Sequence, residues 1–120
     1  MKLKRFWKPP ESGIPEISVQ QFHDWLQDHG GAQVVDARTK VEYLLGTIGN
    51  ARHAPLTEMP GSMELLSLDA SRPVVVLCLT GHRSRPGTRW LQAHGYDAFS
   101  LRGGVMAWKA AGFLTEKPKE

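Results

Sequence analysis

The sequence predicts an α/β domain with a mainly parallel β-sheet flanked by helices. Short apolar runs typical of strands alternate along the chain with short segments whose apolar residues recur at helical spacing. The strongest run, residues 73–78, has no polar alternation, as expected of a central parallel strand covered on both faces. A length of 120 residues suffices for one domain with a sizeable core.

Composition divides the chain into an expected extended basic arm (residues 1–15), a folded domain (16–113) and a polar tail (114–120). Four of the 15 basic residues stand in the first eight positions, so the rest, with 12 acidic residues, is close to neutral. We therefore expect a solvated arm, with no nucleic acid or membrane as partner. No apolar segment follows the basic N-terminus, and no run approaches the roughly 18 apolar residues of a membrane span, so we expect a cytoplasmic protein.

Capping signals and glycines delimit the expected helices. Ser18 with Gln21, and Thr39 with Glu42, form capping-box patterns. Ser84 is the expected N-cap of a later helix. Glycines follow the helical segments, as they do at helix ends. The helices are expected within residues 18–30, 39–46, 62–68, 84–95 and 103–112.

The expected strands are short and mostly apolar. The first, at 16–17, is expected to be an edge strand, and the third is a brief extended segment within an irregular region. The strands are expected at residues 16–17, 33–36, 52–54, 73–78 and 98–101. Because ligand sites of parallel sheets form at the carboxyl ends of strands, the end of the fourth strand is the place to look for chemistry.

Cys78 stands at that end and is the only cysteine of the chain. A lone cysteine after an apolar run is often a small buried hydrophobe. Here, however, a six-residue loop with Gly81 follows and leads into a helix. Backbone N–H groups of such a loop and the positive end of a helix dipole both favour a thiolate. The pattern therefore indicates a reactive thiol.

Three blocks of sequence form an ordered pattern. The first is Cys78–Ser84 after a valine strand. The second comprises Val35–Arg38, Glu42-Tyr43 and Gly46–Ile48, and the third comprises Leu101–Gly104 and Ala107-Trp108. Together they resemble the family of single-domain rhodaneses, which are sulfurtransferases. The first block is similar to the active-site loop of that family, the second to its Asp-x-Arg, Glu-aromatic and glycine–isoleucine segment, and the third to its closing Gly-Gly and Trp segment.

The resemblance implies a five-stranded sheet between helices and a sulfur-transferring activity. Cys78 would take the outer sulfur of a small anionic donor such as thiosulfate and pass it, as a persulfide, to cyanide or a thiol. The loop amides would bind the substrate, and no cofactor or metal is needed. The substrate-binding residues implied are Leu79, Thr80, Gly81, His82, Arg83 and Ser84.

Four further residues are expected to support the site. Asp36 can accept backbone N–H bonds at a strand end, Arg38 can pair with Glu42 or another carboxylate, and Trp108 is expected in the core or the pocket wall. Arg83 has two open interpretations, an anion-binding group or the partner of an acidic neighbour.

Two positions depart from the family pattern. Thr47 stands where the family usually has His, and Gly49-Asn50 stands where it usually has Pro-Gly, and we expect a local change in this loop. Single-domain members often have Glu at the position of Glu42, but two-domain thiosulfate enzymes tend to have a basic residue there, which makes thiosulfate a less secure donor for this chain.

Three alternatives to a small-molecule sulfurtransferase remain open. The first is a sulfur carrier or binding module that passes persulfide to a partner protein. The second is a domain whose catalytic role has lapsed. The third is a cysteine phosphatase or arsenate reductase, but those need a Cys-x5-Arg loop, and here four residues separate Cys78 from Arg83. The histidines show no metal-ligand spacing. The chain is expected to be a monomer or dimer.

Overall fold

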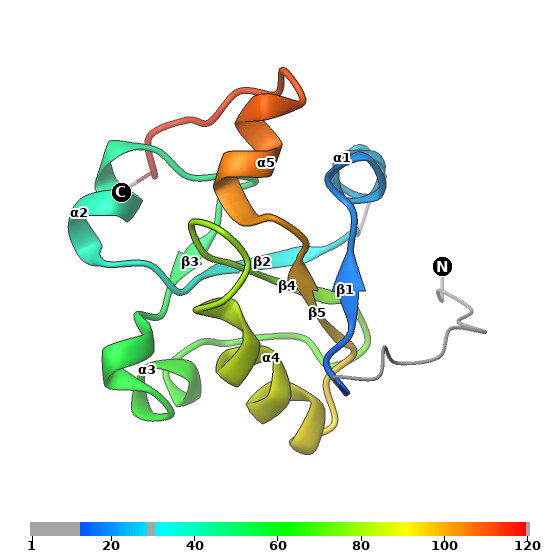
Figure 1. Cartoon of the computed structure of the whole chain (residues 1–120). Coiled ribbons are helices and arrows are strands. Elements are labelled where there is room, and N and C mark those ends of the chain that lie inside the picture. The colour runs from blue at the N-terminus through cyan, green and yellow to red at the C-terminus, as the bar shows by residue number, and fades with distance from the viewer. Residues whose placement is uncertain (1–12, 29–30, 120) are drawn as a thin grey trace.

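A computed structural model describes residues 13–28 and 31–119. It contains a five-stranded sheet in the order β1-β5-β4-β2-β3, and every pairing is parallel (Figure 1). The strands are β1 (Glu16–Ile17), β2 (Gln33–Asp36), β3 (Arg52–His53), β4 (Val74–Leu77) and β5 (Ala98–Leu101). The predicted α/β class with a parallel, five-stranded sheet is confirmed. Of the arm expected at residues 1–15, residues 1–12 lie outside the described residues, as does Gly30, whereas Ile14 is buried.

In the described residues, six helical segments lie between or after the strands. They are α1 (Val19–Leu26), α2 (Lys40–Leu45), the 3-10 turn η1 (Leu56–Glu58), α3 (Gly61–Glu64), α4 (Ser84–Ala93) and α5 (Gly104–Ala110). The helix expected within 62–68 is shorter than predicted, because the weakly patterned segment after Glu64 leaves the helix.

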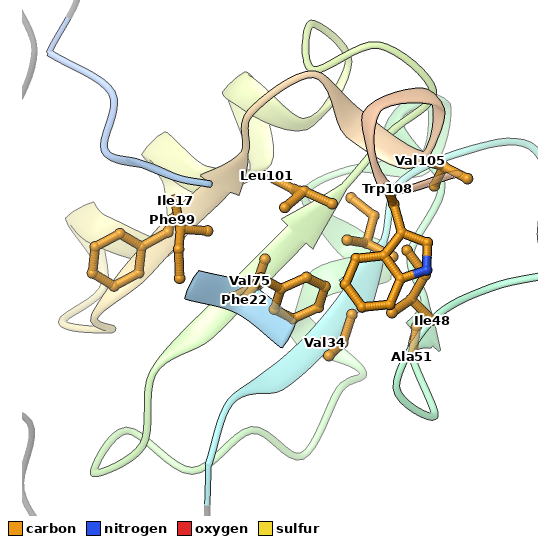
Figure 2. Packing of buried hydrophobic residues seen from close by; sticks show 11 residues of the cluster. Ile17, Phe22, Val34, Ile48, Ala51, Val75, Phe99, Leu101, Val105 and Trp108 are labelled. Carbon is orange, nitrogen blue, oxygen red and sulfur yellow. The ribbon is translucent and has the colours of Figure 1, made fainter. Parts of the chain in front are cut away.

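The sheet is buried on both faces, as the β4 sequence predicts. Helices α1 and α5 lie on one side of the sheet and α3 and α4 on the other (Figure 1). Successive side chains of a strand point to opposite faces. Val75 therefore joins a cluster with Phe22 and Trp108 (Figure 2), while Val76 packs with Leu91 on the other face.

Helix starts follow the capping signals in two of three cases. The Ser18 hydroxyl accepts the N–H of Gln21, and Thr39 forms the complete capping box with Glu42. The prediction that Ser84 caps α4 is wrong. Arg83 is the N-cap, without a side-chain cap bond, and the Ser84 hydroxyl is buried beneath the helix instead, where it meets Ser100.

The strand register places the ends of β2, β4 and β5 side by side. Asp36 pairs with Leu77 across β2 and β4, and Val76 pairs with Ser100 across β4 and β5. The segments that leave these three strands therefore meet at one edge of the sheet. No helix among the described residues is long and apolar enough to cross a membrane.

Candidate active site

The Cys78 side chain follows β4 directly and has no exposed surface. The N–H of Gly81 donates to Cys78 Sγ at 2.9 Å. Gly81 has φ +98°, and a Cβ on it would lie 3.0 Å from the Gly103 nitrogen. Glycine is therefore required for the turn that aims this N–H at the sulfur.

The other loop amides are available to a bound anion. Within the described part of the chain, the N–H groups of Leu79, Thr80 and residues 82–84 donate to no backbone carbonyl. The loop runs directly into the ten-residue helix α4, whose N-terminus carries partial positive charge. The structure thus brings one amide to the sulfur and leaves a row of others beside it.

The start of α5 holds the loop from behind. The N–H groups of Val105 and Met106 donate to the carbonyl oxygens of Cys78 and Leu79 at 2.8 and 3.0 Å. Gly104, at φ +64°, passes so close that a Cβ on it would overlap the carbonyl oxygen of Cys78. This contact was not predicted from the sequence, although the Gly-Gly pair is the signal for it.

Ser84 forms a second contact with the sulfur and connects it to Ser100, a residue that was not predicted for the site from the sequence. Cys78 Sγ lies 3.5 Å from Ser84 Oγ, and Ser84 Oγ lies 2.5 Å from Ser100 Oγ. All three side chains are fully buried. The only signal for Ser100 was a polar residue within an otherwise apolar strand.

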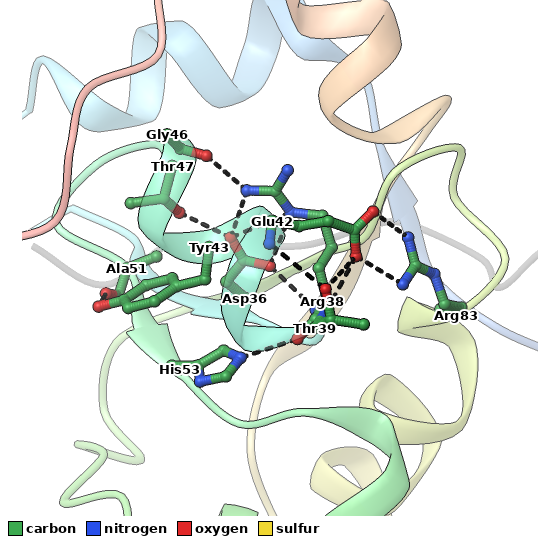
Figure 3. Close-up of polar contacts among 10 residues, drawn as sticks. All are labelled: Asp36, Arg38, Thr39, Glu42, Tyr43, Gly46, Thr47, Ala51, His53 and Arg83. Carbon is green, nitrogen blue, oxygen red and sulfur yellow. Dashed lines mark hydrogen bonds and ion pairs between the residues drawn. The ribbon is translucent and has the colours of Figure 1, made fainter.

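Arg83 pairs with Glu42 rather than standing free. Its Nη1 and Nη2 donate to the two carboxylate oxygens of Glu42 at 2.8 and 2.9 Å, and Glu42 also accepts the N–H of Thr39 (Figure 3). Hydrogen bonding to Arg83 lowers the pKa of Glu42 to about 2. The same pair raises the pKa of Arg83, against a smaller effect of burial. Of the two interpretations of Arg83, pairing with an acidic neighbour is the one found in the structure.

Asp36 and Arg38 form a buried ion pair at the end of β2 (Figure 3). Arg38 Nη2 donates to Asp36 at 2.8 Å and to the carbonyl of Gly46 at 2.6 Å. Thr47 Oγ1 donates to the same carboxylate at 2.8 Å. Arg38 therefore pairs with Asp36 and not with Glu42. The Thr47 departure from the family pattern is accommodated locally, as expected.

The remaining predicted site residues are dispersed. Trp108 lies in the core, its ring centroid 5.4 Å from that of Phe22. His82 is exposed, with Nδ1 3.2 Å from the hydroxyl oxygen of Thr80. Leu79 is half-buried. The described residues contain no group of three His, Cys, Asp or Glu side chains suited to a metal ion.

A cavity lies away from the Cys78 loop. It measures about 750 Å³ and is lined mainly by α1, the start of β2 and the segment after α5, including Trp25, Gln33 and Phe113. None of residues 78–84 lines it. The burial of Sγ and the loop amides locate the chemistry better than cavity size does, because a single sulfur atom needs little room.

Comparisons with known proteins agree with this geometry. The family model described as "Rhodanese-like domain" matches residues 18–111. The chain is 32% identical over 107 residues to a sulfurtransferase of Allochromatium vinosum, covering 88% of this chain and 98% of the relative. It is 36% identical over 81 residues to the thiosulfate sulfurtransferase GlpE of Pseudomonas paraeruginosa, covering 67% and 72%. A rhodanese-like domain protein of Staphylococcus aureus superposes with a TM-score of 0.74 at 29% identity, covering 88% of this chain and 100% of that one.

Proposed function

The chain belongs to the rhodanese-like domain family, and on that premise we propose that it transfers a sulfane sulfur through a persulfide on Cys78. One observation carries the proposal. The sulfur of Cys78 stands at the end of β4, receives the N–H of Gly81 at 2.9 Å, and faces the start of α4. Relatives named as sulfurtransferases, at 29% to 36% identity, support the same class of reaction.

The first step forms the persulfide. The thiolate of Cys78 attacks the outer sulfur of a donor such as thiosulfate. A bond forms between Sγ and that sulfur, the S–S bond of thiosulfate breaks, and its electron pair leaves with sulfite. The negative charge then rests on the transferred sulfur, where the free amides of Leu79, Thr80 and residues 82–84 can stabilise it as an oxyanion hole stabilises oxygen.

The second step restores the thiolate. A nucleophile such as cyanide or a thiolate attacks the outer sulfur of the persulfide, and the electron pair of the broken S–S bond returns to Sγ. No electrons enter or leave the protein in either step.

Arg83 contributes to donor binding only indirectly. Both of its terminal nitrogens donate to Glu42, so recognition of a small dianion depends mainly on the backbone amides. We therefore expect weak binding of thiosulfate, with a KM well above that for a donor that adds contacts outside the loop. A protein donor is the favoured second candidate for this reason.

The proposal is tested by mass spectrometry after exposure to thiosulfate. We expect a mass gain of one sulfur atom, lost on treatment with cyanide and absent in Cys78→Ser. Because the chain has one cysteine, a gain in the intact protein reports this residue alone. A protein that gains no sulfur from thiosulfate or from a persulfidated protein would contradict the proposal.

A further inference from the structure

We propose that Ser100 is a positioning residue for Cys78, acting through Ser84 to stabilise the thiolate. The inference rests on the proposed function in that Cys78 is taken as the reacting group. Ser100 is on β5, outside the active-site loop. Its Oγ lies 2.5 Å from Ser84 Oγ, and this hydroxyl is its only connection to the sulfur among the described residues.

The three side chains form one isolated chain of polar groups. Each is fully buried. Among the described residues, the Ser100 hydroxyl bonds to the Ser84 hydroxyl alone, and Ser84 Oγ bonds only to Ser100 and Cys78. Because the three groups are buried away from water, the protonation state of the sulfur decides which group donates each of these hydrogen bonds.

The order of donors favours the thiolate. With a thiolate, Ser100 donates to Ser84 and Ser84 donates to Sγ, so each hydroxyl hydrogen has an acceptor. With a thiol, one hydrogen is left over in the described structure: either the S–H donates to Ser84 and the Ser100 hydrogen has no acceptor, or Ser84 donates to the sulfur and the S–H has none. A hydrogen bond donated to Ser84 Oγ polarises its O–H, and a bond to a charged acceptor gains most from this, so Ser100 strengthens the bond that Ser84 donates to the thiolate.

Ionic interactions near the sulfur do not by themselves explain why the thiolate is favoured over the thiol. Arg83 of the loop is paired with Glu42, and Arg38 after β2 is paired with Asp36. Among the described residues, the hydrogen-bond partners of Sγ are neutral groups, the N–H of Gly81 and the hydroxyl of Ser84. Ser100 can therefore be changed without altering any ion pair.

The experiment compares alkylation of Cys78 by iodoacetamide in the wild type, Ser100→Ala and Ser100→Thr at neutral pH. For Ser100→Ala we expect the rate, and the ultraviolet absorbance of the thiolate, to fall about 3- to 10-fold, the effect of one neutral hydrogen bond. Ser100→Thr keeps the hydroxyl and should recover both. Ser62→Ala, which removes a hydroxyl that donates to the carbonyl of Pro55, should match the wild type.

Two results would overturn the inference. One is an equal alkylation rate in the wild type and Ser100→Ala. The other is a Ser100→Thr rate as low as that of Ser100→Ala with an intact fold by circular dichroism, which would assign the effect to packing. Neither readout requires sulfur transfer, so a failure of the proposed function in the mass experiment is recognised separately.

Discussion

Glu42 shows how one side chain serves both a helix and the loop. It completes the capping box of α2 with Thr39 and holds Arg83 in a bidentate pair. The pair connects α2 to the residue that starts α4, although the two are 41 positions apart in the chain. A single carboxylate thus couples the conformation of the Cys78 loop to a neighbouring helix.

This coupling predicts a pH-dependent contribution to stability. The pKa of Glu42 is lowered from 4.5 to about 2 in the folded state. Its stabilising contribution is therefore complete above pH 4.5 and disappears as the pH falls towards 2. Because the pair is partly exposed and screened, we expect Glu42→Gln to lower the free energy of unfolding by only about 1 kcal/mol at neutral pH.

Urea unfolding at several pH values measures this effect. The difference between the wild type and Glu42→Gln should shrink as the pH falls below 4.5. Glu64→Gln, which changes an exposed carboxylate on α3, should show no such trend. A Glu42→Gln difference that stays constant down to pH 2 would contradict the assignment.

At the scale of elements, the start of α5 is the support on which the Cys78 loop depends. Gly104 lets the amides of Val105 and Met106 reach the loop carbonyls. In Gly104→Ala, a Cβ would overlap the carbonyl oxygen of Cys78 at a backbone φ of +64°. We expect a loss of about 3 kcal/mol or more in stability, together with slower alkylation of Cys78.

Gly112→Ala is the matched control, because it also places a side chain at positive φ. Gly112 has φ +90°, and a Cβ there would meet nothing within 4 Å. Its cost should be limited to about 1 to 2 kcal/mol of backbone strain, with an unchanged alkylation rate. Equal losses in the two variants would show that the close approach at Gly104 is unimportant.

Elements marked by local signals were predictable from the sequence, and contacts between distant segments were not. The valine run and the Thr39 capping box are local, and both predictions are confirmed. Ser84 was expected to cap its helix because capping is the usual local use of serine. The partner that draws it inward, Ser100, is 16 positions away and becomes its neighbour only when β5 pairs with β4. The choice of Glu42 for Arg83 likewise depends on tertiary structure.

For the whole molecule, one cluster joins α1 and α5 to the sheet. The Trp108 ring lies 5.4 Å from Phe22 and 4.7 Å from Phe113, measured between centroids. Trp108→Ala would leave a cavity between both helices and the strands, so we expect a loss of about 3 to 5 kcal/mol. Small domains have only about 5 to 15 kcal/mol of stability in total.

Thermal unfolding followed by circular dichroism measures the loss. Met106→Ala, on the same helix but with the side chain 55% exposed, should change stability by no more than about 0.5 kcal/mol. A Trp108→Ala variant as stable as Met106→Ala would mean that the cluster does not hold these layers together.

The complete burial of Cys78 also matters for damage by oxidants. A thiolate oxidised to sulfenic acid is usually rescued by a second thiol that converts it to a disulfide, whereas further oxidation is largely irreversible. This chain has no second cysteine, so rescue requires a thiol from another molecule. Sγ is fully buried beneath the loop, so the loop that admits the proposed sulfur donor must also admit peroxide and any rescuing thiol. Recovery of an oxidised Cys78 therefore depends on the same access to the sulfur as sulfur transfer does.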